Sequence, residues 1–279
     1  MEHEDFGGHH GIIGPGELQY MTAGRGIVHT EVPGSEGENK GFQLWVNLKR
    51  KDKLVKPDYQ ELGAKKVPKA RTEDGGVEAS IIAGAALGIE SPVHTRQPVY
   101  YADFRMLPGA TLQHPIPSAF NAFLYVLQGS LTVGPEEKAS LVPVHHTAVL
   151  SLSKGAAEAL LAEQKAGGKK KKATEPAGES GESEESAAGG GKAKAGEGGE
   201  GSGADWQDGV HIRAGKKGAR FILVAGEPTN EPVVQHGPFV MTSQEEIMQA
   251  FRDYQTGRHG FEKARGWESK AVSERRVMV

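Results

Sequence analysis

The sequence contains no cysteine, and this absence excludes several kinds of site at once. A chain without thiols has no disulfide framework, no thiolate metal site and no cysteine nucleophile. Charge of one sign is not in large excess either, since the formal net charge is −3 at pH 7. Because no strong positive field is available for phosphates, we expect no direct binding of nucleic acid. No apolar run approaches the roughly 20 residues of a membrane-spanning helix, so no membrane segment is expected.

Large apolar side chains are missing from residues 162–205, which contain no Val, Ile, Leu, Met or aromatic residue. Such a segment cannot bury enough apolar surface to offset the entropy of ordering its backbone, about 1–2 kcal/mol per residue. Strand-like sequence resumes at residues 210–213 and 219–226, so we expect a disordered low-complexity insertion inside a domain. Its lysine run, 169–172, is either a solvated tract or a nuclear-import signal.

Short stretches of alternating apolar and polar residues, separated by glycine and proline, dominate the rest of the sequence. This pattern is typical of antiparallel β-barrels and sandwiches. The expected strands cover residues 11–13, 17–21, 27–32, 41–48, 77–84, 99–106 and 122–134. We expect a turn at Gln128–Gly129 to divide the last of these into two strands, and another turn at Pro108–Gly109. Residues 49–69 read as a charged connector with a short helix over 57–62.

One helix is predicted near the C-terminus. Ser243 and Glu246 form a capping-box pattern, and Gly257 follows as a closing residue. Between them, apolar residues recur at helical spacing, which indicates a face that packs against the core. These residues are Ile247, Ala250, Phe251 and Tyr254.

His29 and Glu31 are the residues that suggest chemistry. Positions two apart on a strand share one face, so the imidazole and the carboxylate are aimed at the same point. These groups suit iron, manganese, nickel, copper or zinc, but two groups do not complete a site. The pair alone therefore also fits a hydrogen bond within a strand. His3, His9 and His10 are the nearest histidines that could supply a further ligand.

No other catalytic or cofactor-binding pattern is present. The sequence has no nucleophile elbow, no phosphate-binding loop and no dinucleotide fingerprint after a strand. The adjacent pair His145–His146 cannot direct both rings to one face of a strand, so we expect no second metal site there. The remaining histidines have no spaced partner and are expected to be structural.

Several long and distinctive strings run through the sequence. They include His-Glu-Asp-Phe-Gly-Gly-His at 3–9, Met-Thr-Ala-Gly-Arg-Gly-Ile-Val-His-Thr-Glu-Val-Pro at 21–33, Gln-Leu-Trp-Val-Asn-Leu at 43–48 and Gln-His-Gly-Pro-Phe-Val-Met at 235–241. On these strings the chain resembles the pirin family of the cupin superfamily. The resemblance covers nearly the whole chain except the insertion.

This resemblance implies two antiparallel cupin barrels, a bicupin; together with the helix predicted above, we expect an all-β fold with a C-terminal helix. We expect a truncated N-terminal cupin domain over 1–70 and a C-terminal cupin domain over 71–279 that carries the insertion. The family holds one iron ion (Fe2+ or Fe3+) in the N-terminal barrel through three histidines and a glutamate. The last His-x-Glu pair of that set corresponds to His29 and Glu31.

The first two ligands of the family belong to a His-Pro-His-Arg-Gly-Phe segment, which this sequence does not contain. We therefore expect an incomplete first barrel and an incomplete metal site. Two explanations fit this expectation: a gene model that starts at an internal methionine, or a genuine short form. We favour the former, because a barrel that lacks strands leaves unpaired edges.

Two functions follow from the resemblance. The first is metal-dependent co-regulation of transcription by a monomer that binds transcription factors or other proteins, in the cytoplasm, the nucleus or both. The alternative is a quercetin 2,3-dioxygenase that acts on a flavonol. In the enzyme, Glu31 would serve as ligand and as base. That activity is expected only if the two preceding histidines exist.

Overall fold

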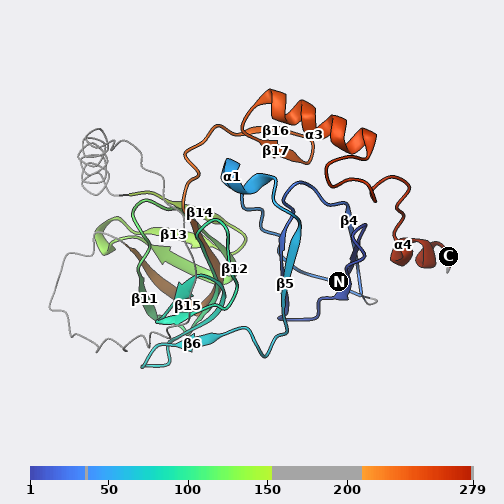
Figure 1. Ribbon diagram of the computed structural model, residues 1–279. Coiled ribbons are helices and arrows are strands. Elements are labelled where there is room, and N and C mark those ends of the chain that lie inside the picture. Colours follow the sequence, from blue (N-terminus) through green and yellow to red (C-terminus); the bar gives the residue numbers. More distant parts are fainter. Residues whose placement is uncertain (35–36, 153–208, 278–279) are drawn as a thin grey trace, which may run out of the picture.

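The computed structural model describes residues 1–34, 37–152 and 209–277, and its regular structure is mainly antiparallel β (Figure 1). The expected all-β class is confirmed. The expected disordered insertion at 162–205 lies outside the described residues. None of the helices in the described ranges is long and apolar enough to cross a membrane.

The larger of the two main parts is an eight-stranded antiparallel sheet, at the left of Figure 1. Its strands are β6 (Lys69–Arg71), β7 (Val77–Ala83), β10 (Val99–Met106), β11 (Thr111–His114), β12 (Asn121–Val133), β13 (Ser140–Pro143), β14 (Thr147–Leu150) and β15 (Val210–Gly226). The order is β13-β12-β15-β10-β7-β6, with β11 paired to β15 and β14 paired to β12. Strand β15, which follows residues 153–208 in the sequence, therefore belongs to the same sheet as the strands that precede them. A two-stranded ribbon of β8 (Ala85–Ala86) and β9 (Ile89–Glu90) adjoins it.

Alternation of apolar residues sets the inward face of this sheet. In β7, Val77, Ala79 and Ile81 are buried while the residues between them are partly exposed. The same period in β10 and β15 brings Phe104 and Phe221 into register, with their rings stacked at 5.1 Å. Burial of such rings is the main favourable term for this part of the fold.

The expected turn at Gln128–Gly129 is wrong, because β12 runs unbroken from Asn121 to Val133. Its register against β15 shifts between Val126 and Gln128 and again after Gly129, so the irregularity is a β-bulge. Gly129 has φ +70°, and a Cβ there would lie 2.0 Å from the Gly218 carbonyl oxygen. Glycine is therefore required by a close backbone approach and not by a chain reversal. The turn at Pro108–Gly109 is confirmed, since the Ala110 amide donates to the Leu107 carbonyl at 3.1 Å.

The second part contains two small antiparallel sheets. One has the order β2-β1-β4, and the other pairs β3 with β5. Their strands are β1 (Glu2–Asp5), β2 (His10–Ile12), β3 (Leu18–Thr22), β4 (His29–Val32) and β5 (Asp58–Leu62). Strands near 11–13, 17–21 and 27–32 are thus confirmed. The short helix expected over 57–62 is wrong, because these residues form β5 and pair with β3.

The expected strand over 41–48 is also wrong, since these residues have no regular secondary structure. Alternation predicts an apolar face, but a strand also needs a neighbouring backbone to pair with. No described strand pairs with residues 41–48. Two short elements remain. Helix α1 (Arg50–Lys53) lies between β4 and β5, and the 3₁₀ turn η1 (Glu136–Lys138) lies between β12 and β13.

The predicted helix near the C-terminus is confirmed as α3 (Gln244–Thr256), which packs on the hairpin of β16 (Val234–His236) and β17 (Phe239–Met241). The Ser243 side chain accepts a hydrogen bond from the Glu246 amide, and Gly257 ends the helix at φ +64°. A second helix, α4 (Lys270–Val277), was not predicted. Glu4 of β1 attaches its start by accepting hydrogen bonds from the Ala271 amide at 2.8 Å and from the Ser269 hydroxyl.

Candidate metal centre

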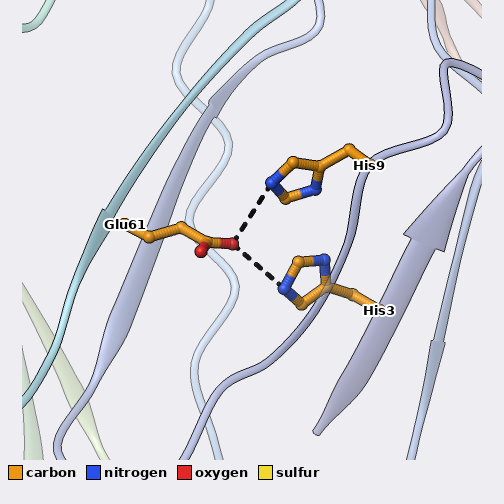
Figure 2. Close-up of side chains that lie close together, drawn as sticks. All are labelled: His3, His9 and Glu61. Atoms are coloured by element: carbon orange, nitrogen blue, oxygen red, sulfur yellow. Dashed lines mark ion pairs between the residues drawn. The ribbon is translucent and has the colours of Figure 1, made fainter.

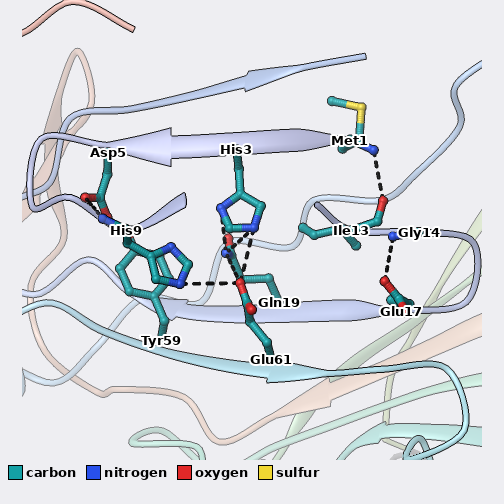
Figure 3. Close-up of polar contacts among 10 residues, drawn as sticks. All are labelled: Met1, His3, Asp5, His9, Ile13, Gly14, Glu17, Gln19, Tyr59 and Glu61. Atoms are coloured by element: carbon teal, nitrogen blue, oxygen red, sulfur yellow. Dashed lines mark hydrogen bonds and ion pairs between the residues drawn. The ribbon is translucent and has the colours of Figure 1, made fainter. Parts of the chain in front are cut away.

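Polar side chains gather where β1 faces the β3–β5 pair (Figure 3). His3 of β1 is 3% exposed and points toward Gln19 of β3 and Glu61 of β5. His9 reaches the same point from the turn that follows β1. Three strands and one turn, drawn from distant parts of the sequence, therefore place their polar groups together.

His3, His9 and Glu61, which we call the triad, bring three ligand atoms within 4.8 Å of one another (Figure 2). The Nε2 atoms of His3 and His9 lie 3.2 Å and 3.4 Å from the same Glu61 oxygen, Oε1. Within the described ranges, this is the only group of three His, Asp or Glu side chains that close together. Such a set can hold a proton in a hydrogen bond or a metal ion.

The rings of the triad are held in place by their neighbours. The His9 ring lies between two others, 5.1 Å from the His3 ring and 4.1 Å from the Tyr59 ring, and it is stacked on both. The Asp5 carboxylate accepts a hydrogen bond from the His9 backbone amide at 3.1 Å and another from the Tyr59 hydroxyl. Asp5 therefore fixes both the turn and the aromatic ring that cover His9.

Burial and nearby groups shift the pKa values of His3 and Tyr59. Burial lowers the pKa of His3, the neighbouring His9 lowers it further, and the carboxylates of Glu61 and Glu31 oppose this shift. A neutral His3 imidazole at pH 7 leaves one ring nitrogen with a free lone pair. Burial and the adjacent Asp5 raise the pKa of Tyr59, so its hydroxyl stays protonated and continues to donate.

The predicted ligands, His29 and Glu31, lie on β4 beside β1. In the antiparallel register His29 stands opposite Asp5, and Glu31 stands opposite His3. Directly opposite residues project from the same face of a sheet, so His29 and Glu31 share the face that carries His3. No hydrogen bond or ion pair joins the His29 ring to a described residue, and Glu31 accepts one weak bond from Gln43 Nε2 at 3.3 Å. Their role as metal ligands stays a prediction.

His29 and Glu31 also line a large open hollow of about 3090 Å³ between the two parts of the molecule. Exposed aromatic side chains line it beside them, with Phe42 54% and Trp45 67% exposed. The opposite wall is formed by polar residues of the large sheet, including the ion pair of Arg220 with Asp103 at 2.6 Å. None of the triad residues lines this hollow.

The other histidines lie elsewhere. His10 is exposed and contacts Glu2 at 3.1 Å, on the face of the N-terminal sheet opposite to that of His3. His145 and His146 lie in an exposed turn, where His145 has φ +62°. His114 is buried alone in the large sheet.

Glu61 is not among the residues predicted from the sequence, because the pattern over 57–62 predicts a helix and not a strand. The signal that could have found it is the alternation in Asp58–Leu62, which places Tyr59 and Glu61 on one face of a strand.

Comparisons with known proteins agree on one family. Residues 1–46 match the family described as Pirin, and residues 101–167 and 202–260 match the Pirin C-terminal cupin domain. Pirin of Homo sapiens is 40% identical over 271 residues, which cover 97% of this chain and 74% of that protein. A pirin-like protein of Solanum lycopersicum is 40% identical, covering 96% of this chain and 73% of its own length.

Solved structures give the same fold. A quercetin 2,3-dioxygenase from Acinetobacter baumannii superposes with a TM-score of 0.65 at 23% identity, covering 93% of this chain and 72% of that one. GK1651 from Geobacillus kaustophilus superposes with a TM-score of 0.56 at 26% identity, covering 83% and 72%. At these identities the likeness shows the cupin fold and leaves the function open.

Proposed function

Because this chain belongs to the pirin family, we propose that it is a metal-binding cupin protein that co-regulates transcription through protein partners. The ion we assign to it is iron, held by His29 and Glu31 as two of its ligands. The observation that carries this assignment is the register of β4 on β1, which fixes both side chains on one face. The partners we expect are transcription factors or other proteins, in the nucleus or the cytoplasm.

The two residues fit an iron-type ion by the chemistry of their donors. One imidazole and one carboxylate belong to the set that non-haem iron prefers. The His29 ring has no competing partner among the described residues, and Glu31 gives up only a 3.3 Å contact with Gln43. When bound, the ion would supply a Lewis-acidic, redox-active centre beside the hollow. His29 and Glu31 would hold it, and Phe42 and Trp45 offer exposed aromatic surface for a partner at the same hollow.

Metal binding by the purified full chain tests this assignment. Iron binding should weaken by at least about 100-fold in His29→Ala and in Glu31→Gln, since the loss of a ligand costs at least as much as the loss of an outer-shell partner. Bound iron would be measured by dialysis and elemental analysis. His211→Ala, which removes an exposed histidine from β15, is the matched control and should bind as the unaltered chain does. Equal iron contents in all four proteins would refute the assignment.

A second candidate is a quercetin 2,3-dioxygenase-type activity. What favours it is the aromatic lining of the hollow beside His29 and Glu31, which would suit a planar flavonol. In this function the Glu31 carboxylate would accept the proton of a flavonol hydroxyl. Iron-loaded protein that also carries the two preceding family histidines should consume quercetin and dioxygen, and His29→Ala should abolish this turnover. Iron binding without quercetin consumption would leave the non-enzymatic role and reject the dioxygenase.

A further inference from the structure

We propose that the triad of His3, His9 and Glu61 is a site for a divalent transition-metal ion, separate from the site assigned to His29 and Glu31. The proposal does not depend on the proposed function, because it uses none of the same ligands. The two sites are neighbours, since Glu31 stands directly opposite His3, but His3, His9 and Glu61 do not line the hollow that His29 and Glu31 line.

The distances within the triad suit a shared ion. Metal bonds to imidazole nitrogen and carboxylate oxygen of about 2.0–2.2 Å place neighbouring ligand atoms roughly 3.0–3.5 Å apart in octahedral or tetrahedral geometry. The two distances from Glu61 Oε1 to the histidine nitrogens, 3.2 Å and 3.4 Å, fall in this range. Two imidazoles and a carboxylate favour zinc, cobalt, nickel or copper over magnesium and calcium, which prefer all-oxygen sites.

Gln19 supplies a fourth group at the centre of the triad. Its amide nitrogen lies 3.0 Å and 3.1 Å from the two ring nitrogens of His3 and 3.1 Å from Glu61 Oε1. The Gln19 amide nitrogen is thus within hydrogen-bond distance of both the His3 ring and the Glu61 carboxylate. A half-turn of the side-chain amide exchanges its nitrogen for its oxygen, which would give a fourth metal ligand.

The backbone leaves room for this arrangement at Gly11. Strand β2 places Gly11 directly opposite His3. A Cβ at Gly11 would lie 2.7 Å from His3 Nε2 and 3.3 Å from Glu61 Oε1. A side chain at this position would therefore clash with His3 and crowd Glu61, two of the three residues of the triad.

The site is both supported and accessible. Tyr59 and Asp5 hold the His9 ring and its turn, as outer-shell residues do around metal ligands. The buried Nδ1 of His9 has no hydrogen-bond partner among the described residues, so Nε2 is the nitrogen that this ring presents to Glu61. Glu61 is 47% exposed and His9 31% exposed, which leaves a path for a hydrated ion.

Counting bound ions in variants of the full chain tests this proposal. Metal-free protein would be dialysed against Zn2+ or Co2+, and bound ion measured by elemental analysis and by the visible spectrum of the cobalt form. Glu61→Gln and His9→Ala should each lower the affinity for one ion by at least about 100-fold. Gln19→Leu should lower it by roughly 10–100-fold. His10→Ala is the matched control, because it removes an adjacent but outward-facing imidazole. Glu61→Gln keeps the size of an exposed side chain, so it tests the site even if His9→Ala disturbs the stacked rings.

The outcomes separate this proposal from the proposed function. Loss of one Zn2+ or Co2+ ion in Glu61→Gln with no change in His29→Ala would support the triad and show that His29 does not bind this ion. Loss in His29→Ala with full binding by Glu61→Gln would overturn the triad and keep that assignment. An unaltered chain that binds no Zn2+ or Co2+ would also overturn the triad.

Discussion

Phe221→Ala should lower the free energy of unfolding by about 3–5 kcal/mol, the usual cost of removing a buried phenylalanine side chain. Phe221 is 0% exposed at the centre of β15, and its ring stacks on Phe104 at 5.1 Å. Strand β15 pairs with both β10 and β12 at this residue, so the cavity would lie between strands that cannot easily close it. Urea denaturation followed by circular dichroism would measure the loss.

Val149→Ala is the control for this substitution. Val149 lies on β14 in the same sheet but is 81% exposed, so its loss should change stability by less than about 0.5 kcal/mol. If the two substitutions cost the same, the Phe104–Phe221 pair would not be the centre of the core.

The sequence was sufficient to predict elements that depend on residues close to one another along the chain. The strand β7 follows from the alternation of Val77, Ala79 and Ile81 with Glu78 and Ser80. Helix α3 follows from Ser243 at its start and Gly257 at its end. The bulge at Gly129 could not be predicted in this way. The same glycine fits a turn or a bulge, and only the approach of Gly218 decides between them.

In the candidate metal centre, too, only the residues that are close in sequence could be predicted together. His29 and Glu31 stand two residues apart, so the strand period alone places them together. The triad depends on the pairing of β5 with β3 and on the packing of that pair against β1, and neither is encoded within one short stretch. The sequence identifies His3 and His9 as possible further ligands because they are near His29 along the chain. Glu61 can be identified only from the three-dimensional structure.

A pH-dependent loss of stability is expected from His114. Its side chain is 3% exposed against Phe104, and its Nδ1 has no hydrogen-bond partner among the described residues. Burial lowers its pKa from 6.5 to about 4. Below about pH 6.5 the unfolded chain therefore binds a proton that the folded chain does not, so stability falls as the pH falls. The loss should reach about 2 kcal/mol by about pH 5 and about 3 kcal/mol below about pH 4, at 1.36 kcal/mol per pKa unit.

His114→Leu should remove this part of the pH dependence. Leucine keeps an apolar side chain of similar volume against Phe104 and has no group to protonate, so stability at about pH 7.5 should change by less than about 1.5 kcal/mol. Urea denaturation at about pH 7.5 and about pH 5 should show a fall for the unaltered chain that is roughly 2 kcal/mol larger than for the variant. His211→Ala, at an exposed histidine of β15, should retain the full fall. Carboxylates with lowered pKa values, such as Glu4, add the same acid sensitivity to all three proteins, so the comparison isolates His114. Equal falls in the unaltered chain and His114→Leu would mean that His114 becomes protonated in the folded state without cost, against its burial beside Phe104.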